Sequence, residues 1–362
     1  MGKQTRLYEN HLKSKGKMVD FAGWDMPIHY GSQIEEHNSV RQSAGVFDVS
    51  HMTVVDIAGE DAQPYLCYLL ANDVGRLGTA GDALYSAMLN HEGNVLDDLI
   101  VYRMEDRYRL VVNCATRAKD LRWLIQNSDG FRVSIEEKPH LAILAIHGPE
   151  SINKCCELVP PESASRIKEL KYFQGMALGD WFVARTGYTG ELGLEFIIPE
   201  EAAPEFWSNL LSIGINPIGL GARDTLRLAA GMNLYGQDMD ETTSPLAANM
   251  ERTIAYDPLD REFIGRPALI AHNEMRKAGE IPVLVGLVLE GRGMLRNGQK
   301  VLTDLGHGLI TSGGFSPTLK HSIALARIPD NSSSCEVELR GKDTSVRIVE
   351  PNFVRFGKKV FK

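Results

Sequence analysis

The sequence predicts an α+β fold with mostly antiparallel sheets. The first observation is a series of short runs in which apolar and polar residues alternate, each bounded by Gly, Asn, Asp or Pro, as in half-buried strands. These runs are MTVVDIAG, LYSAMLN, NVLDDLIVYRM, YRLVVN, HLAILAIHG and DWFVARTGYTGELGLEFIIP. The second observation is two interspersed stretches, EDAQPYLCYLLAN and TRAKDLRWLIQNS. They predict helices because their apolar residues recur every three or four positions and each has an Asp or Thr that could cap the start.

The third observation is a break in the pattern near residues 272–282. The segment AHNEMRKAGEIPVLVGLVLEGRGM passes from a charged helix through Gly and Pro to a new series of apolar strands. Nearly everything that follows is strand and turn, so we expect a compact β-barrel or sandwich at the C-terminus.

Length and composition narrow the class of protein. At roughly 150 residues per domain, the 362 residues predict two or three domains. The formal charge of -8 disfavours a protein that binds nucleic acid through phosphate contacts. No apolar run approaches the roughly 20 residues of a spanning helix, and the polar start MGKQTRLYENHLK has no secretory or transit signal. We therefore expect a cytoplasmic protein without nucleic-acid or membrane partners.

Cysteine and histidine give little indication of chemistry. The five cysteines fit neither a disulfide framework nor a zinc pattern, so we expect no metal site. The adjacent Cys155 and Cys156 could form a redox element, but ordinary reduced thiols are favoured. His51, in DVSHM, has no serine nucleophile elbow beside it and is expected to be a structural hydrogen-bonding residue.

Two adjacent carboxylates, Asp97 and Asp98, interrupt the apolar run NVLDDLIVY. Burying an unpaired carboxylate costs on the order of several kcal/mol, so the pair needs partners or a function. Successive strand side chains point to opposite faces, which places Asp98 with Ile100 and Tyr102 and allows only one carboxylate to face a given pocket. Alternatively, both bind backbone amides or a cation near the turn at Gly93.

The stretch RTGYTGELGLEF, residues 185–196, surrounds Tyr188 and two glutamates with glycines. Glycines allow a backbone to approach a flat ligand closely. The spacing is not that of a dinucleotide fingerprint, because the run leads into an apolar strand rather than a helix. The stretch is either a ligand loop or a simple hairpin.

The segment GLGARDTLRLAAGMNLYGQDMDE begins with a helix that carries Arg223 and Arg227 on either side of Asp224. One interpretation is a structural helix stabilised by ion pairs. The other is recognition of an anion or heterocycle, for which the planar guanidinium group is well suited.

Taken together, these motifs resemble the T-protein family of the glycine cleavage system, the aminomethyltransferases. The shared segments, in the same order and at about the same spacing, are MVDFAGWDMPIHYGSQIEEH, FDVSHM, NVLDDLIVY, GYTGELGLE, GLGARDTLRL, NLYGQDMDE, TSGGFSPTL and IALARIP. The resemblance extends from residue 5 to about residue 356.

The resemblance implies three domains around a central folate pocket, the last of them a β-barrel. We expect a discontinuous folate-binding domain of residues 1–52 and 140–270, an inserted domain of residues 53–139 that carries Asp98, and a barrel over residues 280–362. It also implies transfer of the methylene carbon of an aminomethyl group, carried on the lipoyl arm of H protein, to tetrahydrofolate. The products are 5,10-methylenetetrahydrofolate, ammonia and dihydrolipoyl H protein, and the enzyme is expected to be a monomer.

The resemblance also implies the roles of single residues. Asp98 matches the catalytic aspartate, which would stabilise the positive charge on the transferred carbon, while Asp97 would be structural. The resemblance places Glu195 and Tyr188 against the pterin and Arg223 at the folate site. It places Asn113 near the reacting end, Met52 and Tyr235 in the pocket walls, and Arg355 near the folate tail. One departure is Arg252, where many relatives have a tryptophan, and Tyr256 is expected to supply part of that aromatic surface.

Two rival functions share this fold. The first is a relative that binds folate for other work, such as an accessory factor or a demethylating enzyme, but the cysteine signature and the flavin domain of those relatives are not found in this sequence. The second is a folate-binding regulator without catalysis, which would not need Asp98 and Asn113 at the reacting end.

Overall fold

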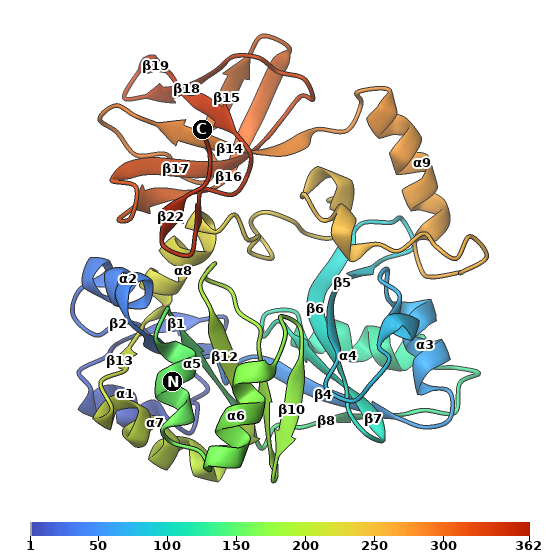
Figure 1. The fold of residues 1–362 in the computed structure, drawn as a ribbon. Coiled ribbons are helices and arrows are strands. Elements are labelled where there is room, and N and C mark those ends of the chain that lie inside the picture. Colours follow the sequence, from blue (N-terminus) through green and yellow to red (C-terminus); the bar gives the residue numbers. More distant parts are fainter. Residues whose placement is uncertain (1) are drawn as a thin grey trace.

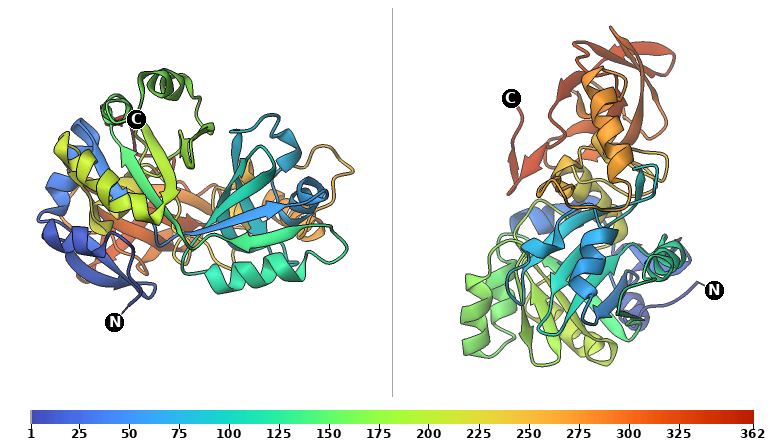
Figure 2. Two further views of the ribbon diagram at one scale, coloured as in Figure 1. Left: turned by 90° about the horizontal axis from the view of Figure 1, so that it is seen from below. Right: turned by 90° about the vertical axis from the view of Figure 1, so that its right-hand side faces the viewer.

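A computed structural model describes residues 2–362, and three large sheets contain most of its strands (Figure 1). The six-stranded and five-stranded sheets lie side by side, and the seven-stranded C-terminal sheet lies above them (Figure 2). Antiparallel pairs dominate, and the short strand β13 pairs parallel with β3. The predicted α+β fold with mostly antiparallel sheets is confirmed.

The six-stranded sheet has the order β10-β11-β12-β9-β3-β13. Its strands are β3 (Gly45–Asp48), β9 (Leu141–His147), β10 (Gly175–Leu178), β11 (Trp181–Ala184), β12 (Gly193–Pro199) and β13 (Asn216–Pro217). Around it lie the hairpin β1 (Lys17–Phe21) and β2 (Trp24–His29), with α1 (Tyr8–Lys13), α2 (Gln33–Gln42), α5 (Ser151–Cys156), α6 (Pro161–Glu169), α7 (Ala203–Ser212) and α8 (Leu220–Ala229).

Alternation along β12 divides its side chains between the core and a cavity. Leu194, Phe196 and Ile198 join the buried cluster that includes Trp207 of α7. The intervening Glu195 and Ile197 line the cavity described below. The core therefore fixes the direction of Glu195, because a strand that buries one face must turn the other away from it.

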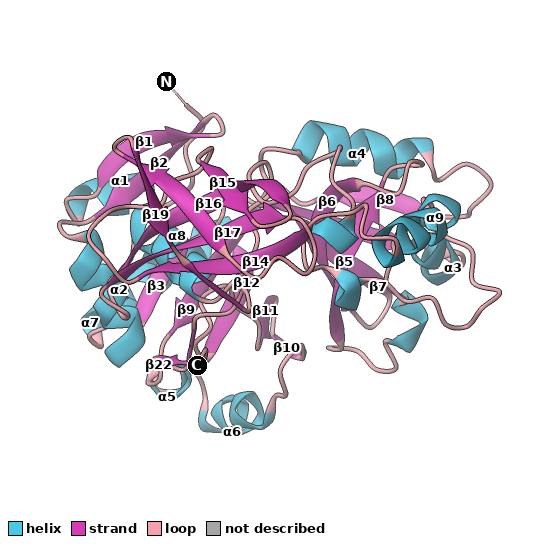
Figure 3. Ribbon diagram, turned by 90° about the horizontal axis from the view of Figure 1, so that it is seen from above, coloured by secondary structure: helices cyan, strands magenta, loops and turns pink. Residues whose placement is uncertain are grey.

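The five-stranded sheet has the order β5-β6-β7-β4-β8. Its strands are β4 (Thr53–Ala58), β5 (Ala83–Leu89), β6 (Val95–Arg103), β7 (Arg107–Val112) and β8 (Ser134–Glu137). The two predicted helices belong to this part as α3 (Ala62–Leu69) and α4 (Arg117–Gln126). In the view of Figure 3, both lie on the opposite side of the molecule from α1, α2 and α7.

The C-terminal sheet has the order β19-β18-β15-β16-β17-β14-β20. Its strands are β14 (Val283–Leu289), β15 (Lys300–Thr303), β16 (Gly306–Ser316), β17 (His321–Ile328), β18 (Cys335–Leu339), β19 (Lys342–Ser345) and β20 (Arg347–Val349), followed by the hairpin β21 (Val354–Arg355) and β22 (Lys358–Lys359). Helix α9 (Arg266–Lys277) precedes it. The predicted break near residues 272–282 therefore covers the last turns of α9 and the connection of residues 278–282 to β14. The sheets follow the expected division at residues 53–139 and 280–362, but the domain boundaries themselves stay a prediction.

One predicted run differs from the structure. DWFVARTGYTGELGLEFIIP contains two strands, β11 and β12, joined by a loop of residues 185–192. Glycines in and beside this loop permit close contacts with other parts of the chain. An added Cβ would lie 2.8 Å from the His147 ring at Gly187 and 3.0 Å from Ala230 at Gly190. The glycines thus pack against protein as in a hairpin, and Gly187 also lines the cavity described below, so the two interpretations of this stretch do not exclude each other.

Candidate active site

A cavity of about 280 Å³ lies between the six-stranded and five-stranded sheets. Helix α8 and the loop of residues 231–235 supply further parts of its wall. Seven of the eight predicted site residues line it, namely Met52, Asp98, Asn113, Tyr188, Glu195, Arg223 and Tyr235. They come from distant parts of the chain, so the cavity depends on the packing of both sheets.

Asp98 is half-buried at the cavity wall, on β6. Tyr85 Oη donates a hydrogen bond to its Oδ2 at 2.8 Å, and Asn113 Nδ2 donates one to its Oδ1 at 2.9 Å. Burial and the negative charge of Asp97 raise the pKa of Asp98 to about 7, although both hydrogen bonds favour the ionised form. The group can therefore change charge close to neutral pH.

Asp97 points to the opposite side of β6 and is fully buried. Its Oδ2 accepts hydrogen bonds from Asn113 N at 3.2 Å and Thr116 Oγ1 at 3.0 Å. Its Oδ1 accepts one from Asn113 Nδ2 at 2.9 Å, so this single amide nitrogen bridges Asp97 and Asp98. The two adjacent carboxylates thus have separate surroundings, and the bonding of Asp97 agrees with the interpretation in which a carboxylate binds nearby amides.

A second polar group gathers around Glu195. The Thr186 hydroxyl donates a short hydrogen bond to Glu195 Oε2. Burial raises the pKa of Glu195, while the bond from Thr186 and the charge of Arg223 act against this rise. The Arg223 guanidinium lies over the Tyr188 ring, 4.7 Å from its centre, and Tyr188 Oη donates to Asn233 O.

The two interpretations of helix α8 apply to different arginines. Arg227 is buried and pairs with Asp224, with Arg227 Nε 2.8 Å from Asp224 Oδ1, which fits the structural helix. Arg223, in contrast, lines the cavity.

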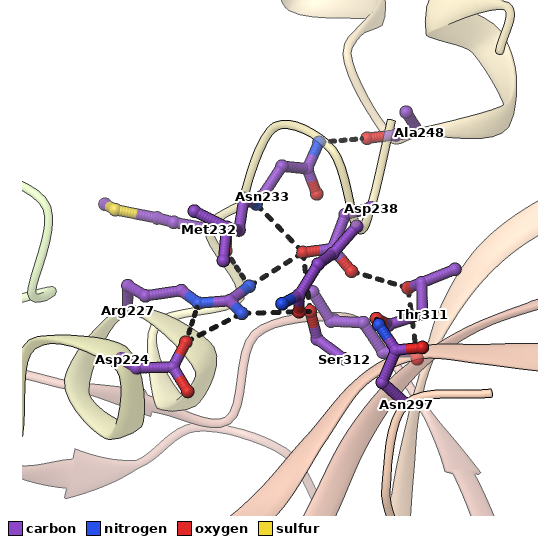
Figure 4. Close-up of polar contacts among 12 residues, drawn as sticks. Asp224, Arg227, Met232, Asn233, Asp238, Ala248, Asn297, Thr311 and Ser312 are labelled. Atoms are coloured by element: carbon purple, nitrogen blue, oxygen red, sulfur yellow. Dashed lines mark hydrogen bonds and ion pairs between the residues drawn. The ribbon is translucent and has the colours of Figure 1, made fainter. Parts of the chain in front are cut away.

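The loop of residues 231–239 is anchored by the buried Asp238 (Figure 4). Arg227 Nη1 lies 2.7 Å from Asp238 Oδ2, and the Leu234 backbone N–H donates to the same oxygen at 2.9 Å. From β16 of the C-terminal sheet, Thr311 Oγ1 donates to Asp238 Oδ1 and Ser312 Oγ donates to Asp238 Oδ2. The C-terminal sheet thereby supports a cavity wall to which it contributes no lining residue among residues 2–362.

The remaining predicted residues lie in different places. Tyr235 lines the cavity, and its hydroxyl accepts a hydrogen bond from Lys119 Nζ at 2.7 Å. Met52 also belongs to the lining. Arg355, on β21, is exposed and lies outside the lining, but its charge acts on Tyr172, which does line the cavity.

Two expectations about aromatic and histidine residues are wrong. Tyr256 does not line the cavity, because its hydroxyl turns to α9, where it accepts a hydrogen bond from Asn273 Nδ2 at 2.8 Å. It therefore supplies no aromatic surface to the cavity. His51 is buried, but its Nδ1 has no hydrogen-bond partner among residues 2–362, and the ring packs edge-on against Phe21.

Tyr85 is a site residue that the sequence analysis missed. In the register of β5 and β6, Tyr85 lies opposite Ile100, and Ala87 lies opposite Asp98. Tyr85 is therefore a diagonal neighbour of Asp98 on one face, within reach of a long side chain. The alternation within LYSAMLN indicates which face of the strand Tyr85 lies on. Predicting its contact with Asp98 also requires knowledge of which strands pair and in which register.

Three further properties concern residues 2–362 alone. In this part of the chain, no three or more His, Cys, Asp or Glu side chains are grouped so that they could hold a metal ion. No helix within it has the length and apolar character needed to cross a membrane. All five cysteines are free, including Cys155 and Cys156.

Two protein families match successive parts of the chain. The GCVT N-terminal domain matches residues 7–258, and the glycine cleavage T-protein C-terminal barrel domain matches residues 283–355. An aminomethyltransferase of Chromobacterium violaceum is 56% identical over 361 residues, covering 99% of each chain. One of Pseudomonas syringae pv. tomato is 55% identical over 360 residues, again covering 99% of each. The crystal structure of glycine cleavage system aminomethyltransferase T from Bartonella henselae is 32% identical, with a TM-score of 0.89 and 100% of both chains covered.

The fold and the cavity thus define a transferase with a GCVT unit followed by a C-terminal barrel. The resemblance found in the sequence motifs is confirmed over the full length. The chain belongs to the aminomethyltransferase family, the T proteins of the glycine cleavage system.

Proposed function

We propose that this enzyme transfers the methylene carbon of an aminomethyl group, carried on the lipoyl arm of H protein, to tetrahydrofolate. The products would be 5,10-methylenetetrahydrofolate, ammonia and dihydrolipoyl H protein. The observation that carries the proposal is the pair of carboxylates in one cavity, Asp98 beside Asn113 and Glu195 beside Arg223. Family membership supports the reaction class.

Asp98 would act on the reacting carbon. As the carbon leaves sulfur, it becomes iminium-like and positively charged, and a fixed anion beside it lowers the energy of that state. Tyr85 and Asn113 hold the two Asp98 oxygens, so little reorganisation is needed during the reaction. Binding both reactants in one cavity adds the advantage of proximity.

Glu195 and its neighbours would bind the pterin. The ring presents donors arranged like those of guanidine, which a carboxylate can accept in pairs. Thr186 already bonds Glu195 Oε2 and fixes the orientation of the carboxylate. Tyr188 and Met52 provide flat and polarisable surface for the ring. Arg355, whose charge acts on the lining residue Tyr172, would attract the glutamate carboxylates of the folate tail.

The partner would be the lipoylated H protein, and the working enzyme a monomer that contacts its carrier transiently in the cytoplasm. The volume of about 280 Å³ lies just below the range of small-molecule pockets, so the cavity would hold the pterin ring and the end of the lipoyl arm, with the folate tail outside it. No metal is assigned a step in this reaction.

The test measures methylenetetrahydrofolate formed from tetrahydrofolate and aminomethylated lipoyl H protein. Asp98→Asn should lower kcat by about 10²- to 10³-fold while folate still binds, since an oriented charge is lost. Asp97→Asn is the matched control. Its loss should be smaller, because the side chain does not face the cavity and the amide oxygen that replaces the carboxylate can still accept the hydrogen bond from Asn113 Nδ2. Equal losses in both variants would contradict the role of Asp98. A wild type that binds folate but never turns over would contradict the proposed reaction.

A further inference from the structure

Asp120 is a fully buried carboxyl group on α4, behind Asp97 and outside the cavity lining. A buried carboxylate normally accepts several hydrogen bonds. Neither oxygen of Asp120 accepts one from a donor among residues 2–362. The carboxyl group of Asp97 lies beside that of Asp120, close enough for the two to share a proton.

Two buried carboxyl groups in contact cannot both be ionised at low cost, because like charges repel strongly where water is excluded. Lys119, the neighbouring cation on α4, favours ionised Asp120 only weakly, since its Nζ bonds Tyr235 Oη and Glu241 Oε1, each at 2.7 Å. The contact is therefore stable when the two carboxyl groups share one proton.

The hydrogen bonds around each carboxyl group decide whether Asp97 or Asp120 carries the shared proton. Asp97 accepts hydrogen bonds from three donor groups, Asn113 N, Asn113 Nδ2 and Thr116 Oγ1, as an ionised carboxylate would. Thr116 also lies beside Asp120, but its single hydroxyl proton is directed to Asp97 Oδ2 or Asn113 O, so Asp120 is satisfied as the acid that donates to Asp97. Burial and the charge of Asp97 also raise the pKa of Asp120 far above its ordinary range.

We propose that Asp120 is a positioning residue for the transfer reaction. As a neutral acid, Asp120 holds the carboxylate of Asp97. Asp97 then fixes the Asn113 amide, and this amide orients Asp98. This inference rests on the proposed function for its catalytic consequence. The chain of contacts runs from α4 through both sides of β6 to the cavity. Asn113 Nδ2 lies 2.9 Å from Asp97 Oδ1 and 2.9 Å from Asp98 Oδ1, so a turn of this amide would release Asp98.

The shared proton also sets the charge next to Asp98. With one proton between them, Asp97 and Asp120 carry one negative charge, whereas two would favour protonated and inactive Asp98 still further. The other ionisable groups that face the pair are Lys119 on α4, Tyr85 on β5, Tyr235 on the loop beyond α8, Cys114 after β7 and Asp98 itself.

Infrared spectroscopy tests the proton without reference to catalysis. Well above the pKa of about 7 of Asp98, the free enzyme should show the carbonyl stretch of a buried protonated carboxylic acid. The band should persist in Asp98→Asn and vanish in Asp120→Asn, whose amide can donate to Asp97 without a carboxyl proton. A missing band in the wild type, or one that survives Asp120→Asn, would overturn the proposal.

Activity of Asp120 variants tests positioning. Asp120→Asn should keep kcat close to the wild-type value, because the amide replaces the donor. Asp120→Leu should lower kcat by about 10²-fold with folate affinity unchanged, since small misplacements of reacting groups have effects of this size. Asp129→Asn, at an exposed position just beyond α4, is the control and should match the wild type. Equal losses in Asp120→Asn and Asp120→Leu would refute the positioning role.

The pH profile of Asp120→Asn remains decisive if the leucine variant does not fold. A neutral acid replaced by a neutral amide should leave the acid limb of kcat/KM near the pKa of about 7 of Asp98. A limb displaced to lower pH would show that Asp120 was ionised, against the proposal. An infrared band in an enzyme that does not transfer the carbon would uphold the shared proton and reject the proposed function instead.

Discussion

The Asp98 carboxylate is held by two neutral donors, one on β5 and one directly after β7. Tyr85 and Asn113 each bond one oxygen, and both bonds favour the ionised form. Burial and the neighbouring charge of Asp97 outweigh them and raise the pKa to about 7. A carboxyl group at this balance point gains or loses its charge near neutral pH, so a single lost hydrogen bond should become visible in the activity.

Replacing Tyr85 with Phe removes one donor to ionised Asp98, and its pKa should rise above about 7. The proposed role requires the carboxylate, so activity is present above this pKa and lost as the pH falls through it. The acid limb of kcat/KM should move to higher pH by on the order of one unit, because a hydrogen bond to a charged group contributes about 1.5 kcal/mol.

The control for this prediction is Tyr65→Phe. Tyr65 is also buried, but its hydroxyl donates to Leu124 O at 2.6 Å, in the core of the five-stranded sheet. Its loss should affect stability and leave the acid limb in place. If Tyr85→Phe titrates like the wild type, Tyr85 does not act on Asp98.

The loop of residues 185–192 shows how backbone shape presents side chains to the cavity. Gly190 has a φ of +76°, and a Cβ there would lie 3.0 Å from Ala230 Cβ and 3.1 Å from Val354 O. Phe356 N also donates to Gly190 O at 3.0 Å. The loop is thus held between α8 and the C-terminal hairpin, and Tyr188 is carried by this restrained segment.

Gly190→Ala should destabilise the protein by about 1–2 kcal/mol from backbone conformation, with a further loss from the close contacts. Displacement of Tyr188 should also raise the KM for tetrahydrofolate. Gly179→Ala is a matched control, because Gly179 has a φ of +64° and nothing lies within 4 Å of an added Cβ. Denaturant unfolding and steady-state kinetics of both variants separate the two effects. An unchanged KM in Gly190→Ala would show that the loop does not set the folate site.

Local periodicity predicted the strands and helices, and strand alternation predicted that Asp98 and Asp97 face opposite ways. It could not decide between a ligand loop and a hairpin in RTGYTGELGLEF, because the glycines there contact His147, Ala230 and the C-terminal hairpin. Tyr85 and Asp120 were missed for a related reason. Their contacts with the Asp97 and Asp98 pair depend on strand register and on where α4 packs, which no single segment encodes.

The three sheets meet through the segment that follows α8. Asp238 receives Arg227 from α8 and the hydroxyls of Thr311 and Ser312 from the C-terminal sheet. Further along the segment, Thr243 O accepts a hydrogen bond from Val95 N of the five-stranded sheet at 2.9 Å. One connecting segment therefore links the barrel to the cavity wall and to the strand that bears Asp98.

Asp238→Asn should destabilise the whole chain by on the order of 3 kcal/mol, because Arg227 would lose its buried counter-charge. The other ion-pair partner of Arg227 is Asp224, whose side chain is exposed, so its charge compensates little for the lost charge of Asp238. Folate affinity should fall as the cavity wall loosens. Urea unfolding and folate titration measure both effects, with the exposed Asp343→Asn as control. Wild-type folate affinity in Asp238→Asn would show that this ion pair does not support the site.

The segment after α8 also makes the ligand part of the folding equilibrium. A molecule seated against Tyr235 and Asn233 would press on a wall that the C-terminal sheet holds from behind, through Thr311 and Ser312. Ligand present at 100 times its dissociation constant adds about 2.7 kcal/mol to the free energy of unfolding. Strands that never touch the ligand would share this gain, so the supply of the ligand in the cell would help to set how long the barrel itself stays folded.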